Sequence, residues 1–258
     1  MKKILVTGGT GFIGAALVIR LVREGHAVRV LDNQSRGSSV RIASVIDDVE
    51  LVEADIRDPD AVRQATAGVD SVIHLAYVNG TEFFYTKPEV VLDVGVRGML
   101  NVLDACLAHD VPELVLASSS EVYQTPDQVP TDESTRLSVP DPLNPRYSYG
   151  GGKIICELMA INWGRKNFER VVIFRPHNVF GPAMGWEHVV PQFALRMKAL
   201  SEATPEGVLN FPIQGTGVET RSFVYIDDFT DGLIKVIDQG DHLGIYHIGT
   251  TEELSMID

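Results

Sequence analysis

The chain has 258 residues, 45% of them hydrophobic and 22% charged, and its formal net charge is −13. These proportions are typical of a globular protein with a substantial core, and no apolar run reaches the ~20 residues of a membrane-spanning helix. The acidic balance disfavours a nucleic-acid partner, because binding phosphates requires a basic face. Cys106 and Cys156 lack metal-ligand spacing, so we expect reduced, packed thiols of a cytoplasmic protein and no metal site. The N-terminus leads directly into a strand, so we expect no signal peptide.

The chain begins with a strand that leads straight into a glycine-rich turn. The apolar residues 3–6 precede a turn with glycines at 8, 9, 11 and 14, and a helix-like run follows. Glycine permits a tight turn and a close approach to a ligand, and the start of a helix offers free N–H groups to an anion. A second strand ends at Asp32, about 20 residues further on, where a carboxylate would bind an adenosine ribose. The sequence therefore predicts a dinucleotide site.

Strands and helices alternate along the first two-thirds of the chain. Apolar strands are expected at 49–54, 69–76, 114–117 and 171–174, and helices near Asp58, from Pro88 to His109 and from Ser148 to Asn167. Continuous apolar strands separated by helices indicate a parallel sheet that is covered on both faces. We predict a Rossmann-type α/β fold with a doubly wound parallel sheet in residues 1–180. Residues 181–258, with a helix at 189–200 and shorter strands, would form a smaller substrate lobe.

Polar residues follow directly after these strands, at the sheet edge where ligands of such folds bind. They include Asp32, Asp55, His74, residues 118–121 and residues 175–178. Tyr149 and Lys153 lie four residues apart, on one face of the helix that they open. A nearby ammonium should lower the tyrosine pKa from its usual ~10 and make the phenol suitable as a general base.

Seven motifs occur in the order found in extended short-chain dehydrogenase/reductases. The chain is similar over essentially its whole length to the NAD-dependent nucleotide-sugar epimerase/dehydratase family. The motifs are the glycine turn, Asp55–Asp58, His74–Ala76, Ser119–Tyr123, the Tyr149 and Lys153 pair, Arg175–Pro182 and Arg221–Asp228.

The resemblance implies NAD as the cofactor. Gly8, Gly11 and Gly14 would cradle the pyrophosphate. Asp32 would bind the ribose hydroxyls, which favours NAD over NADP even with Arg36 nearby. The other implied cofactor contacts are Phe12, Ile13, Asn33, Asp55, Ile56, Leu75, Ala76, Tyr149 and Lys153.

The resemblance also assigns roles in catalysis on a nucleotide sugar. Tyr149 would take the proton of the C4 hydroxyl, with Lys153 as its activator and Ser119 as a hydrogen-bonding partner. Asn178 and Arg221 would hold the nucleotide diphosphate. The 4-keto sugar formed in this way can be epimerised, dehydrated or decarboxylated.

Ser120 and Glu121 should decide among these outcomes. Dehydratases of the dTDP-glucose type carry an aspartate where Ser120 stands, whereas the Ser120-Glu121 pair is more similar to UDP-glucuronate decarboxylases and GDP-mannose dehydratases. We predict an NDP-sugar 4-epimerase, with an NDP-uronate decarboxylase or an NDP-sugar 4,6-dehydratase as the alternatives. A non-catalytic dinucleotide-binding regulator is the alternative of a different class, and it would have no need of Tyr149 and Lys153.

Several positions depart from the family pattern and predict a divergent subfamily. Gly95 replaces an asparagine, Gly151 and Gly152 precede Lys153 where a serine is common, and Gln124 replaces a glycine. The chain ends where relatives continue with further elements, so the substrate lobe looks truncated. The resemblance further implies a homodimer, formed by the helix from Pro88 to His109 and the helix that starts at Tyr149.

Overall fold

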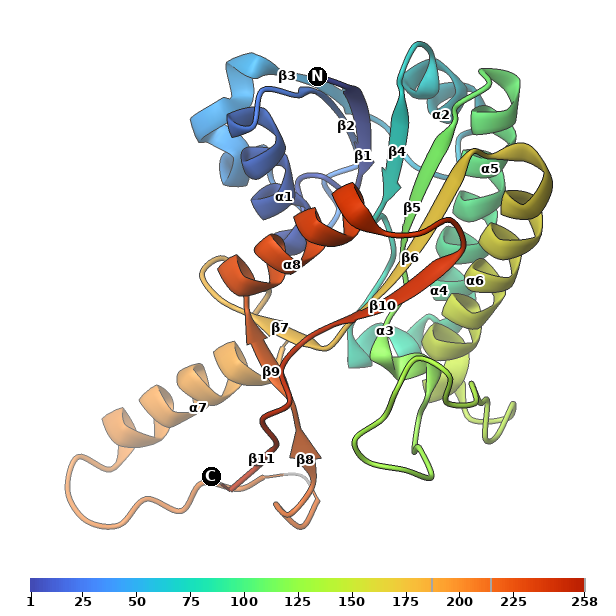
Figure 1. The fold of residues 1–258 in the computed structure, drawn as a ribbon. Coiled ribbons are helices and arrows are strands. Elements are labelled where there is room, and N and C mark those ends of the chain that lie inside the picture. Colours follow the sequence, from blue (N-terminus) through green and yellow to red (C-terminus); the bar gives the residue numbers. More distant parts are fainter. Residues whose placement is uncertain (187, 214, 258) are drawn as a thin grey trace.

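Seven parallel strands form the central sheet of the molecule (Figure 1). The computed structural model describes residues 1–186, 188–213 and 215–257. The sheet order is β10-β6-β5-β4-β1-β2-β3. The chain therefore adds β2 and β3 on one side of β1 and the later strands, starting with β4, on the other side. This confirms the predicted Rossmann-type fold. The strands are β1 (Lys3–Thr7), β2 (Ala27–Asp32), β3 (Val49–Glu53), β4 (Ser71–His74), β5 (Glu113–Ala117), β6 (Arg170–Pro176) and β10 (Gly244–Ile248).

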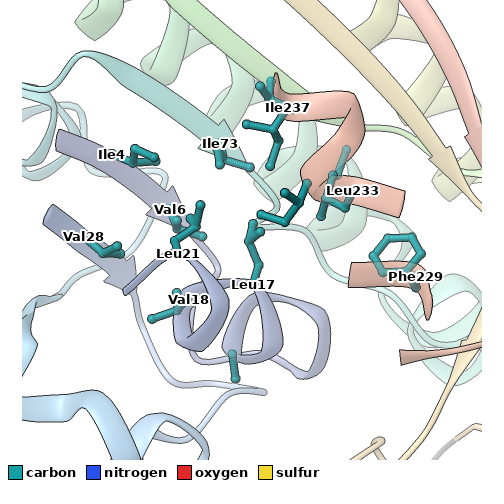
Figure 2. Close-up of a cluster of buried hydrophobic side chains, with 14 of the residues drawn as sticks. Ile4, Val6, Leu17, Val18, Leu21, Val28, Ile73, Phe229, Leu233 and Ile237 are labelled. Atoms are coloured by element: carbon teal, nitrogen blue, oxygen red, sulfur yellow. The ribbon is translucent and has the colours of Figure 1, made fainter. Parts of the chain in front are cut away.

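Helices cover both faces of the sheet, as the apolar strands require. On one face lie α1 (Phe12–Arg23), the 3₁₀ helix η1 (Ser39–Asp48) and α8 (Ile226–Gln239); on the other lie α2 (Pro59–Thr66), α5 (Gly98–Ala108) and α6 (Ser148–Asn167). Figure 2 shows the first core, in which side chains of α1 (Leu17), α8 (Leu233) and β1 (Val6) gather in one cluster. Helices therefore hold the sheet from both sides.

Short elements lie near the carboxyl ends of the strands. They are α3 (Thr81–Thr86), α4 (Pro88–Leu92), the π-helical turn η2 (Asp93–Arg97), and the 3₁₀ turns η3 (Ser120–Val122) and η4 (Pro145–Tyr147). Beyond them, β7 (Asn178–Phe180) pairs with β9 (Phe223–Tyr225), and β8 (Thr220–Arg221) pairs with β11 (Leu254–Ser255). With α7 (Val189–Ala203), these strands project from the sheet (Figure 1).

Helix α2 begins at the residue that the sequence predicts. The Asp58 carboxylate accepts hydrogen bonds from the N–H groups of Asp60 and Ala61 at 3.0 and 3.2 Å, and Pro59 occupies the first helical position. Such a cap satisfies N–H groups that have no partner within the helix.

Two parts of the fold differ from the sequence prediction or go beyond it. The helix expected from Pro88 to His109 consists of α4, the π-helical turn η2 and α5, and it ends at Ala108. Strand β10 and helix α8, both from beyond residue 180, return to the central sheet, where β10 pairs with β6. The division into residues 1–180 and 181–258 stays a prediction.

Candidate active site

The glycine turn packs against the strand-end loop that follows β4. Gly8 has a φ of +75°, and a Cβ at this residue would lie 2.8 Å from the Ala76 nitrogen. A Cβ on Gly14 would lie 2.1 Å from the Gly8 carbonyl oxygen, so a side chain at either residue would displace backbone. Helix α1 starts directly after the turn, with Gly11 as its N-cap. The turn thus has the bare backbone and the helix start that fit a dinucleotide pyrophosphate.

We expect Gly14→Ala to weaken NAD binding at least tenfold and to lower stability by about 1–3 kcal/mol, because the added methyl group overlaps the Gly8 carbonyl. Titration calorimetry with NAD⁺ and a thermal melt would measure both effects. Gly151→Ala is the matched control, since its Cβ would meet only Val139 at 3.4 Å. An unchanged NAD affinity in Gly14→Ala would contradict the placement of the pyrophosphate.

Asp32 is fixed at the end of β2, against the glycine turn. One carboxylate oxygen accepts the Thr10 N–H at 2.9 Å and the other accepts the Gln34 N–H at 2.8 Å. Arg36, which lies four residues after Asp32, is half-buried with its guanidinium 5.1 Å from the centre of the Phe83 ring.

Three of the other predicted cofactor contacts, Asn33, Asp55 and Ile56, lie at the ends of β2 and β3, near Asp32. The Asn33 amide donates to Asp55 at 3.1 Å, and Ile56 is buried next in the chain. Arg57 donates to Asp55 from two of its nitrogens, and these hydrogen bonds lower the pKa of Asp55 to about 2. Asp55 is therefore a carboxylate at neutral pH.

Tyr149 and Lys153 lie on the first turns of α6 and are almost fully buried, with 6% and 3% of their surface exposed. The Tyr149 ring stacks on Phe84, with 5.1 Å between ring centroids, and the neighbouring Ser119 side chain lowers the pKa of its phenol. The Lys153 ammonium donates to the Ala117 carbonyl at 2.7 Å. Because Ala117 ends β5, this bond ties the helix to the carboxyl edge of the sheet.

The predicted effect of Lys153 on Tyr149 is wrong for this structure. Burial raises the pKa of Tyr149 above its usual value, and the Ser119 hydrogen bond opposes that shift. The ammonium lies 5.8 Å from the centre of the Tyr149 ring and donates to the Ala117 carbonyl. Burial also lowers the pKa of Lys153 to about 8. Desolvation thus acts on both groups in the direction of their neutral forms.

Ser119 connects the pair to Glu121. Its side-chain oxygen also accepts the Glu121 N–H at 3.2 Å, which caps the short helix η3 that contains Ser120. The Glu121 carboxylate is paired with Arg146, whose Nη2 atom lies 3.0 and 2.8 Å from its two oxygens. Sequence reasoning missed Arg146, which lies only three residues before Tyr149 and stacks on Phe84 at 5.1 Å.

Gln124 has a φ of +56°, a conformation that favours glycine, which explains why glycine is usual there. Its amide donates to the Glu121 carbonyl. A Cβ on Gly150 would lie 2.3 Å from that amide nitrogen. The unusual glutamine is thus accommodated by a glycine on α6.

The other predicted ligand residues occupy two places. Leu75 and Ala76 follow β4, beside the glycine turn, and Phe12 and Ile13 open α1. Asn178 and Arg221 are exposed in the projecting part, where the Asn178 amide donates to the Ser222 carbonyl at 2.9 Å.

The histidines and cysteines near the site have structural partners or are buried. His74 lies 2.7 Å from the Thr7 hydroxyl, and burial lowers its pKa to about 3. His177 packs on His247, and both cysteines are buried free thiols.

Among the described residues, no three His, Cys, Asp or Glu side chains are grouped to hold a metal ion. Within the same residues, we find no helix that could cross a membrane.

The comparisons with known proteins agree with this geometry. The family model of the NAD dependent epimerase/dehydratase family matches residues 4–249. UDP-glucuronic acid decarboxylase 6 of Arabidopsis thaliana is 34% identical over 99% of this chain, which spans 71% of that protein. The chain is similar in structure to the dTDP-glucose 4,6-dehydratase of Streptomyces venezuelae with NAD bound, at 30% identity and a TM-score of 0.86 over 99% of this chain and 78% of the other.

A solved UDP-galactose 4-epimerase is 28% identical, with a TM-score of 0.81 over 99% of this chain and 79% of the other. The match of the family model spans both the glycine turn and the Tyr149 and Lys153 pair. The chain belongs to the NAD-dependent epimerase/dehydratase family, whose cofactor is NAD.

Proposed function

We propose that this protein decarboxylates a UDP-linked uronic acid through a 4-keto intermediate. One observation carries the proposal: the Ser119 side chain lowers the pKa of the neighbouring Tyr149 phenol, and its oxygen accepts the Glu121 N–H at 3.2 Å. Ser119 thereby links the proposed general base to the backbone of Glu121 at the carboxyl edge of the sheet. The similarity to UDP-glucuronic acid decarboxylases supports the uronic acid, and Ser120 stands where dTDP-glucose-type dehydratases have an acid.

The proposed reaction starts at the sugar C4 hydroxyl. Tyr149, as a phenolate, would accept the hydroxyl proton. NAD⁺, held by the glycine turn and Asp32, would supply the hydride acceptor for C4 and would be restored by the end of the reaction. The resulting ketone makes the uronate a β-keto acid, so its C5–C6 bond breaks with release of CO₂ and leaves an enolate at C4. The Ser119 hydroxyl and the protonated Tyr149 would donate to the enolate oxygen, which stabilises the charge where it develops. C5 then takes a proton, and Ser120 and Glu121 would face C5 and C6.

The test is an incubation with NAD⁺ and UDP-glucuronate in D₂O, followed by NMR and mass spectrometry. Decarboxylation should release CO₂ and place one deuterium at C5 of a UDP-pentose. UDP-, GDP-, dTDP- and CDP-hexoses complete the panel. Turnover of a hexose but not of the uronate would overturn the proposal.

A 4-epimerase is the second candidate, favoured by the similarity to solved epimerase structures. It would invert C4 and incorporate no deuterium, because the same hydrogen returns to carbon. Loss of water with deuterium at C5 would identify a dehydratase. Tight NAD binding without turnover of any sugar would support the non-catalytic regulator.

We also propose a homodimer that is formed by the α4–α5 segment and α6. Leucine and isoleucine side chains are exposed on both, as such an interface would require: Leu92, Leu100, Leu107, Ile155 and Leu158.

A further inference from the structure

Tyr77 fills the space left by two of the glycines that depart from the family pattern. It follows Ala76 in the segment after β4. A Cβ on Gly95 would lie 2.2 Å from the Tyr77 Cζ atom, and a Cβ on Gly152 would lie 2.1 Å from the Tyr77 hydroxyl. Any side chain at 95 or 152 would therefore occupy the place of the ring. The two glycines, one in η2 and one in α6, form a slot for a tyrosine.

The slot places the ring against Lys153. The Lys153 ammonium lies 4.1 Å from the centre of the Tyr77 ring, and the Tyr149 ring meets Tyr77 edge-on, with 5.2 Å between centroids. Among the described residues, the Tyr77 hydroxyl is buried and has no hydrogen-bond partner. The contact that Tyr77 makes with the catalytic pair is thus the face of its ring.

A buried ammonium needs compensation for the water that it has lost. Within the part of the chain that the structure describes, the Lys153 ammonium donates to one carbonyl oxygen, that of Ala117, although an ammonium has three donors. An aromatic face attracts a cation most strongly where both are shielded from water. The Tyr77 ring supplies such a face.

We propose that Tyr77 is a positioning residue of the active site, whose ring face holds the Lys153 ammonium in its charged form beside Tyr149. This rests on the proposed function only for the assignment of Tyr149 and Lys153 as the catalytic pair. The effect of burial on the pKa of Lys153 agrees with it, since a value near 8 leaves the ammonium sensitive to its neighbours.

The test compares Tyr77→Phe, which keeps the ring face, with Tyr77→Leu and Tyr77→Met, which replace it by aliphatic bulk. NMR titration of protein that carries ¹³C at the lysine ε-carbons gives the pKa of Lys153, and loss of a signal in Lys153→Gln assigns it. We expect Tyr77→Phe to titrate like the parent protein. Tyr77→Leu and Tyr77→Met should lower the pKa by about one unit, a tenfold change in the acid constant.

Tyr85→Leu is the matched control, since this tyrosine is exposed on the neighbouring helix α3. A thermal melt shows whether each variant is folded. Because both Tyr77→Leu and Tyr77→Met lack the ring, the test can still be made if one of them does not fold. A Lys153 pKa that is unchanged in both would overturn the proposal. So would a fall in Tyr77→Phe as large as in Tyr77→Leu.

The rate profile gives a second readout once a substrate is known. The falling limb of kcat against pH should move to lower pH in Tyr77→Leu by as much as the Lys153 pKa falls, with little change in KM. The titration needs no sugar, so failure of the proposed function and failure of this inference are distinguishable. A shifted pKa without turnover of any sugar would leave Tyr77 as the residue that holds Lys153, in a protein that is not the proposed decarboxylase.

Discussion

Replacing Tyr149 by phenylalanine should lower kcat by about 10²- to 10⁴-fold, the usual contribution of a positioned general acid or base. The Tyr149 side chain is buried on the first turn of α6, and the neighbouring Ser119 side chain lowers the pKa of its phenol. Phenylalanine keeps the stacking on Phe84 and the edge contact with Tyr77, so the fold should remain intact. Only the group that moves the proton is lost.

The measurement is turnover of whichever nucleotide sugar is converted, together with NAD affinity and a thermal melt. NAD affinity should be retained, because the glycine turn and Lys153 are unaltered. Tyr147→Phe is the matched control, two residues earlier at the N-cap of α6. Full activity of Tyr149→Phe would show that the base is another residue.

Replacing Glu157 by glutamine should lower the free energy of unfolding by about 3–5 kcal/mol, since it leaves a buried guanidinium without its counter-ion. Arg175 and Glu157 are each 2% exposed, and two hydrogen bonds join them, at 2.8 and 2.7 Å. Arg175 also donates to the Tyr123 hydroxyl and to the Glu133 carbonyl at 3.1 Å. The pair therefore fixes the loop after η3 as well as β6 to α6.

Urea unfolding of the two proteins would measure the difference. Glu24→Gln serves as the control, because its partner Arg20 is exposed and such surface pairs contribute about 1 kcal/mol or less. A second variant, with methionine at both 157 and 175, should recover much of the loss, since it leaves no unpaired charge. A change below about 1 kcal/mol in Glu157→Gln would contradict this account.

The sequence predicts the central strands and the residues at their ends well, because each carries a local signal. An apolar run that ends in Asp32, or a glycine turn before a helix, is visible within ten residues. Arg175 shows the limit of that method. It follows an apolar run as the functional candidates do, yet it is buried in an ion pair with Glu157.

The parts that could not be predicted depend on contacts between distant residues. Gly95, Gly152 and Gln124 each appear in the sequence as an isolated departure from a pattern. In the structure, two of them adjoin Tyr77, and the third lies against Gly150. Glu121 likewise gives no sign of its pairing with Arg146, 25 residues away. Strand β10 joins β6 across a long stretch of chain, and nothing in its own residues specifies that neighbour.

The π-helical turn η2 gives α4 and α5 different rotational phases. Val91 of α4 packs in the cluster with Phe84 and Tyr149, whereas Met99 and Leu103 of α5 pack in the core beneath the sheet. A regular α-helix advances by about 100° per residue, and a π turn holds an additional residue. Deletion of one residue between Asp93 and Arg97 would restore a regular helix and turn one of these two apolar faces away from its neighbours. A change in chain length at this turn would therefore act on the active site, whereas the exposed loops that lie further away could gain or lose residues freely.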